Sequence, residues 1–180
     1  RLTYLRRKHT MFEAKSDTGV LTRYTVIVDA PASELWNVLL DKITAPEKYM
    51  PDVLSVDITK QFSPYSVERS IRVGNNKTVN ELVTANTLTK TVIFKIQNDA
   101  FFRGFVTQSI YEEDGQTYLE YVMNWSGKGC DAPDLHNGVV SEVIKNVVEN
   151  TKRITEERHL QTKQEVDDLM PLRLVLDDDQ

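Results

Sequence analysis

The chain has 180 residues, 40% hydrophobic and 27% charged, with a formal net charge of -5. That length suits one domain with a sizeable core, and no run of eighteen apolar residues offers an integral membrane segment. The acidic balance disfavours nucleic acid as a partner, because a duplex binder normally carries a basic face. The lone Cys130 excludes an intramolecular disulfide and a CxxC metal site. We therefore expect no metal and no cofactor, and a cytoplasmic protein.

The chain begins with an extension, one strand and two short helices. Residues 1–20 lack a sustained period and are treated as an N-terminal extension with room for a short pairing segment. Residues 21–28 alternate and predict a strand that ends at the Asp-Ala-Pro turn, residues 29–31. We expect Pro31 in the first turn of a helix that ends near Lys42, and a second helical turn over residues 45–49. The apolar side of the first helix is Leu35, Trp36, Leu39 and Leu40.

A meander of strands follows. Gly74-Asn75-Asn76 indicates a tight turn, and Asp114-Gly115 is the strongest hairpin signal in the sequence. Alternation predicts six strands here, over residues 54–58, 67–73, 79–85, 91–97, 105–111 and 117–125. With the strand over residues 21–28, this makes seven antiparallel strands.

A long helix is predicted over residues 134–158, with Asp131 or Asp134 as its cap. One side is an apolar stripe of Val140, Val143, Ile144, Val147, Thr151 and Ile154. Glu142, Lys145, Glu149 and Lys152 point away from this stripe, and we expect Lys152 to be solvated. The stripe should lie on the inner face of the sheet and leave a hollow beside it. The domain then covers residues 21–158, and residues 159–180 form a mobile tail or a segment that docks on the surface or on a neighbouring subunit.

Strand alternation places four polar side chains on apolar, inward faces: Arg69, Glu81, Gln108 and Tyr121. The Asp-Gly hairpin pairs Gln108 with Tyr121. A turn around Gly74 puts Arg69 opposite Val83 and leaves Glu81 as its diagonal neighbour. Two lone charges on apolar faces either pair or line a wet cavity. The alternative is that both lie near the sheet edge and extend to water.

These positions define the candidate site. The expected ligand-binding residues are Arg69, Glu81, Phe94, Gln108, Tyr121, Met123, His136 and Val140, and the catalytic candidates are Glu81 and His136. Three simpler interpretations stay open: His136 as a solvated or capping residue, Tyr121 and Trp125 as core, and Cys130 as an inert thiol.

Several stretches resemble the START-like superfamily, also called SRPBCC or Bet v 1-like. They are VIVDAPASELWNVLLD at residues 26–41, the strand with Asn80-Glu81, the hairpin FFRGFVTQSIYEEDG and the exit MNWSGKG. The resemblance covers about residues 20–158 and is nearest to the AtaL-like branch. It implies an α+β helix-grip fold, in which a seven-stranded curved antiparallel sheet wraps a long C-terminal helix, with two small helices after the first strand.

The resemblance also implies a ligand class. Members bind sterols, lipids, plant hormones or polyketides, and some are cofactor-free cyclases, dehydratases or lyases. The first hypothesis is a protein that binds a small, mostly hydrophobic molecule in the hollow, such as a lipid, a polyketide or a terpenoid-like compound. We expect this protein to be a monomer or a homodimer. The alternative is a cofactor-free cyclase, dehydratase or isomerase of secondary metabolism, in which Glu81 or His136 moves a proton and Arg69 or Tyr121 steadies an enolate. A third is an interaction protein that uses the surface and tail.

Overall fold

The strands and helices follow the predicted order closely. The computed structural model describes residues 9–16, 19–128, 132 and 139–176. The strands are β1 (His9–Ser16), β2 (Gly19–Val28), β3 (Val53–Ser63), β4 (Ser66–Val73), β5 (Lys77–Asn86), β6 (Thr91–Gln97), β7 (Phe102–Glu113) and β8 (Gln116–Gly127). The helices are α1 (Ala32–Thr44) and α2 (Val139–Leu176), with short 3-10 turns η1 (Pro46–Lys48) and η2 (Gly74–Asn76).

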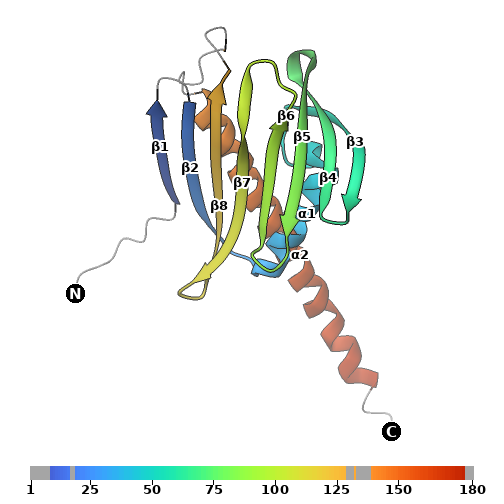
Figure 1. The fold of residues 1–180 in the computed structure, drawn as a ribbon. Helices are drawn as coiled ribbons and strands as arrows, with labels where there is room; N and C mark the ends of the chain where they lie inside the picture. The colour runs from blue at the N-terminus through green and yellow to red at the C-terminus, as the bar shows by residue number, and fades with distance from the viewer. Residues whose placement is uncertain (1–8, 17–18, 129–131, 133–138, 177–180) are drawn as a thin grey trace, which may run out of the picture.

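Within the described residues, eight strands form one antiparallel sheet in the order β1-β2-β8-β7-β6-β5-β4-β3. Both helices lie on the same face of this sheet, and α2 crosses it diagonally (Figure 1). The seven predicted strands and the helix-grip arrangement are confirmed. The eighth strand, β1, lies in the region treated as an extension and pairs along its whole length with β2, from His9 opposite Val26 to Ser16 opposite Gly19.

The core lies between the sheet and the two helices. Tyr24, Val26 and Val28 alternate along β2 and are buried, as their period of two predicts. Leu35 and Leu39 of α1 are fully buried against the same face. The burial of this apolar face is what fixes the helices on the sheet.

Helix α1 begins at Ala32, after Pro31, and therefore later than predicted. Pro31 is the N-cap rather than part of the first turn, and its carbonyl accepts the N–H groups of Glu34 at 3.0 Å and Leu35 at 3.2 Å. The helix ends at Thr44, two residues beyond the predicted end. Pro46 then opens η1, which confirms the second helical turn.

Helix α2 corrects the predicted C-terminal boundary. Its predicted start at Asp134, like the proposed caps, lies outside the described residues. The helix does not end at Arg158 but continues to Leu176, and its last turns extend beyond the sheet (Figure 1). Residues 159–166 are rich in Gln, Lys and Glu, which have high helix propensity, so the segment remains helical without an apolar stripe.

The buried face of α2 is turned slightly from the predicted stripe. Ile144, Val147 and Thr151 are buried as predicted, but Val143 is 43% exposed. Val148 and Thr155 are buried instead.

Two of the α2 side chains predicted to point away from the apolar stripe bind the sheet. Glu149 accepts a 2.6 Å hydrogen bond from the Tyr24 hydroxyl, and Lys152 Nζ donates to the Ile27 carbonyl at 2.5 Å. The predicted solvation of Lys152 is wrong, because Lys152 and Glu149 flank the buried face and both reach β2. Glu142 and Lys145 are exposed as predicted.

The part of the chain that the structure describes holds no helix of the length and apolarity needed to cross a membrane.

Candidate functional site

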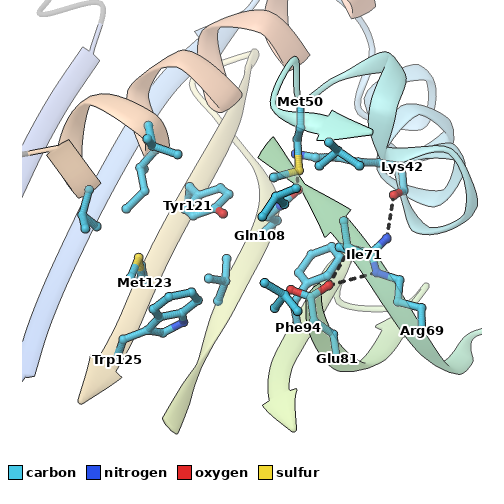
Figure 2. A pocket seen from close by; sticks show the side chains of 17 residues that line it. Lys42, Met50, Arg69, Ile71, Glu81, Phe94, Gln108, Tyr121, Met123 and Trp125 are labelled. Carbon is cyan, nitrogen blue, oxygen red and sulfur yellow. Dashed lines mark hydrogen bonds and ion pairs between the residues drawn. The ribbon is translucent and has the colours of Figure 1, made fainter. Parts of the chain in front are cut away.

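A cavity of about 240 Å³ lies between the sheet and the first turns of α2. Most of its lining is apolar, and Met123, Phe94 and Val140 belong to it. Five polar side chains also reach it: Lys42 from α1, Arg69 from β4, Glu81 from β5, Gln108 from β7 and Tyr121 from β8. Figure 2 shows Arg69 and Glu81 on one side, Met123 and Trp125 on the other, and Gln108 and Tyr121 between them. The two charged side chains of the ion pair therefore lie at one end of the cavity, called here the polar end.

Arg69 and Glu81 form an ion pair at the polar end. Glu81 Oε2 accepts Arg69 Nε at 2.9 Å and Nη2 at 2.8 Å. Arg69 Nη1 donates to the carbonyls of Lys42 at 3.0 Å and Ile43 at 2.6 Å, in the last turn of α1. The guanidinium is thus satisfied on both sides although Arg69 is only 3% exposed. The predicted pairing is confirmed, and extension of Arg69 to water is excluded.

The register that brings this pair together differs from the prediction. Arg69 lies directly opposite Glu81, and Val67 rather than Arg69 lies opposite Val83. The turn consists of the three residues of η2, and β5 begins directly after it, at Lys77. The strand predicted from the sequence began two residues later, at Val79. Each residue of β4 is therefore paired two positions earlier in β5 than predicted.

Gln108 and Tyr121 occupy the register that the Asp-Gly hairpin predicts. They are directly opposite each other on β7 and β8, and Asp114 and Gly115 both have positive φ, 51° and 72°, as a type I′ turn requires. Burial, followed by the nearby Glu81 carboxylate, raises the pKa of Tyr121 far above its usual value, although Arg69 and a hydrogen bond with Gln108 oppose the shift. Tyr121 is therefore a neutral hydrogen-bond donor at physiological pH.

Lys42 is the functional candidate that the sequence analysis missed. Its side chain is buried, and Nζ donates to Gln108 Oε1 and to Thr151 Oγ1, each at 3.3 Å. Burial first, and the Arg69 guanidinium second, lower the pKa of Lys42 to about 7, while Glu81 opposes the shift. The signal was present in the sequence: Lys42 follows Leu35 by seven residues and Leu39 by three, so it continues the buried stripe of α1.

Trp125, predicted as core, also lines the cavity. Its ring stacks on Phe102 with centroids 5.9 Å apart. Trp125 Nε1 is buried without a hydrogen-bond partner among the described residues. Gly104, which faces Trp125 across β7 and β8, has φ 133°, and a Cβ there would lie 2.0 Å from the Asn124 carbonyl oxygen. Only glycine permits this close approach of the two strands.

The cavity thus brings together every predicted site residue that the structure describes: Arg69, Glu81, Phe94, Gln108, Tyr121, Met123 and Val140. His136 and Cys130 lie outside the described residues. Within the described ranges, no three His, Cys, Asp or Glu side chains are grouped to hold a metal. The binding and catalytic roles of the lining residues stay predictions.

A curved antiparallel sheet that grips a long helix over an apolar cavity defines the START-like, helix-grip class of proteins. Comparison with family models agrees: the model for "Polyketide cyclase / dehydrase and lipid transport" matches residues 20–156. The chain belongs to this family. The closer resemblance to the AtaL-like branch stays a prediction.

Two solved structures illustrate the shared fold. The Zhui aromatase/cyclase from Streptomyces sp. R1128 superposes with a TM-score of 0.65 at 14% identity, over 79% of this chain and 94% of that one. The di-domain ARO/CYC StfQ of the steffimycin biosynthetic pathway gives a TM-score of 0.67 at 15% identity, over 79% of this chain and 52% of that one. This chain thus corresponds to about half of StfQ. A search of curated proteins gives no significant match.

Proposed function

We propose that this protein encloses a small, mostly apolar molecule that carries one oxygen-bearing polar group. The observation that supports this function best is the cavity itself, apolar at one end and furnished with hydrogen-bond donors at the other. At about 240 Å³ it is just below the roughly 300–1,000 Å³ of sites for drug-sized ligands. The ligand should therefore be small: a short lipid, a monoterpenoid-like molecule or a small aromatic polyketide fragment.

The polar end determines how such a ligand would be oriented. Tyr121 and Lys42 are donors, whereas the Glu81 carboxylate already accepts two N–H groups from Arg69. A ligand acceptor such as a carbonyl oxygen matches these donors better than a ligand donor would. The Trp125 N–H, which has no partner among the described residues, offers a third donor toward the other end of the cavity.

The second candidate function is a cofactor-free cyclase, dehydratase or isomerase. Its support is the Lys42 amine, whose pKa of about 7 suits a group that gives and takes a proton at neutral pH. Tyr121, a neutral donor on the same wall, could stabilise an enolate oxygen. Under this alternative we assign the proton transfer to Lys42 rather than to Glu81, because Glu81 Oε2 already accepts two N–H groups from Arg69.

Ligand binding can be tested by native mass spectrometry of freshly purified protein, followed by titration with short lipids and small aromatic ketones. Val140→Trp places an indole in the cavity wall, and Val166→Trp makes the same change at an exposed position of α2. We expect Val140→Trp to weaken binding at least tenfold and Val166→Trp to leave it unchanged. Equal affinity of the two variants, or no binding by the wild type, would refute the proposal.

A further inference from the structure

The Lys42 side chain has surroundings unlike those of an ordinary lysine. Nζ is held between a Gln108 amide oxygen and a Thr151 hydroxyl, both neutral, and within the described residues it forms no ion pair. The carboxylate of this wall, Glu81, is engaged by Arg69. The Glu81 carboxylate is thus bound to Arg69, and the Lys42 amine has only neutral hydrogen-bond partners.

We propose that Lys42 is a carbonyl-reactive lysine, whose amine condenses with an aldehyde or ketone group of the bound ligand to form an imine. This inference rests on the proposed binding function and names its ligand class: small apolar carbonyl compounds. It is supported by the buried position of Lys42 in the cavity wall, by the neutral partners of Nζ, and by the donors that favour a carbonyl oxygen at this end. A desolvated lysine beside another cation is a recognised arrangement for such chemistry.

The charge environment favours the free amine that the reaction needs. The Arg69 guanidinium, on β4, lowers the pKa of Lys42. The Glu81 carboxylate, on β5, raises this pKa but has the smaller effect. The remaining groups around the amine, Gln108, Thr151 and Tyr121, are uncharged at neutral pH. With a pKa of about 7, about half of the Lys42 amine is neutral at pH 7.

The reaction is balanced without a cofactor. The nitrogen lone pair forms a C–N bond to the carbonyl carbon while the C=O π electrons move to oxygen. The proton lost by nitrogen is gained by that oxygen, and Tyr121, whose ring centroid is 5.9 Å from Lys42 Nζ, can relay it. The C–O bond of this carbinolamine then breaks, and the hydroxyl leaves as water with the second nitrogen proton. Amine and carbonyl give imine and water, with no change in oxidation state.

The test uses the full chain, benzaldehyde as the probe and sodium cyanoborohydride to reduce any imine to a stable amine at pH 7.5. Peptide mapping then gives the extent of modification at each amine. Surface lysines with a pKa near 10.4 are only about 0.1% neutral at this pH. The N-terminal amine, for which an ordinary pKa is near 7.7, serves as an internal standard.

We expect modification of Lys42 at least tenfold above the mean of the other lysines, with a pH midpoint near 7. Lys42→Met should remove this adduct, and the control Lys145→Met, which replaces an exposed lysine of α2, should keep it. Excess benzyl alcohol, which lacks the carbonyl, and the Val140→Trp substitution should each reduce labelling of Lys42 but not of the N-terminal amine.

The possible failures are distinguishable. If benzyl alcohol binds but Lys42 is labelled no more than exposed lysines, the imine inference is overturned and the binding function stands. If neither benzyl alcohol nor benzaldehyde binds and the short lipids also fail, the proposed function falls as well. Labelling of Lys42 that benzyl alcohol and Val140→Trp leave unchanged would also overturn the inference, because the reaction would not then occur in the cavity.

Discussion

Arg69 and Glu81 show how two charges are kept on an apolar face of the sheet. The two side chains form an ion pair, and Arg69 also donates to two carbonyls at the end of α1. We expect Arg69→Met or Glu81→Gln alone to lower the free energy of unfolding by about 3 kcal/mol, because each leaves a buried partner unsatisfied. The double substitution should lose less than the sum of the two. Urea denaturation of all four proteins measures this coupling, and strictly additive losses would show that the pair does not act as a unit.

Lys42 should make stability depend on pH. Its pKa is about 7 in the folded protein and 10.5 in the unfolded chain, so the unfolded state binds more protons between these values. The cost of burying the ammonium is therefore fully present below pH 7 and decreases as pH rises toward 10. We expect Lys42→Met to exceed the wild type in free energy of unfolding at pH 6, by up to several kcal/mol, and the difference to shrink by pH 9. A difference that stays constant from pH 6 to 9 would show that Lys42 titrates normally.

At the level of the elements, the orientation of α2 gives a graded prediction. Val147 faces the sheet, whereas Val166 lies half exposed on the same helix. Val147→Asp should unfold the domain or lower its free energy of unfolding by more than about 4 kcal/mol, and Val166→Asp should change it by less than about 0.5 kcal/mol. Lys152→Asp should fall between them, at about 1 kcal/mol, because it loses the bond to the Ile27 carbonyl and places like charges beside Glu156. Thermal melts rank the three variants, and a different order would contradict this orientation.

The elements also show what the sequence could predict. Alternation identified β2 to β8, and the Asp114-Gly115 turn determined the register of β7 and β8 because its geometry admits one pairing. β1 was not assigned because His9–Ser16 mixes polar and apolar residues, and its pairing depends on a free edge of β2 that becomes apparent only in the folded sheet. The end of α2 was misplaced because helix propensity continues after the apolar stripe has ended.

The alternation of the strands was enough to predict the site residues that lie on the sheet, but it could not predict Lys42, which lies on helix α1. Arg69, Glu81, Gln108 and Tyr121 all reach the cavity from the inward positions that alternation assigned. Lys42 was not identified because a lysine near a helix end is usually solvated. Its position continues the apolar stripe of α1, and the packing of α1 against β7 and α2 shows that it is buried.

At the scale of the whole molecule, the strand order has a consequence for folding kinetics. Among the described strands, every neighbouring pair is consecutive in sequence except β2 and β8, which join residues 19–28 to 116–127. The hairpins from β3 to β8 can form from local contacts, but the β2–β8 seam must close a loop of some ninety residues, and that loop-closure entropy delays it.

We expect Val83→Ala, in the meander, to slow folding, and Val26→Ala, in β2, mainly to speed unfolding, although both valines are buried. Stopped-flow chevron plots would give the folding and unfolding rates of each variant separately. A higher φ-value for Val26 than for Val83 would mean that the β2–β8 seam forms in the folding nucleus and would contradict this prediction. Such a seam also means that β1 and β2, which are synthesised before β8, leave one edge of β2 unpaired until β8 has been made.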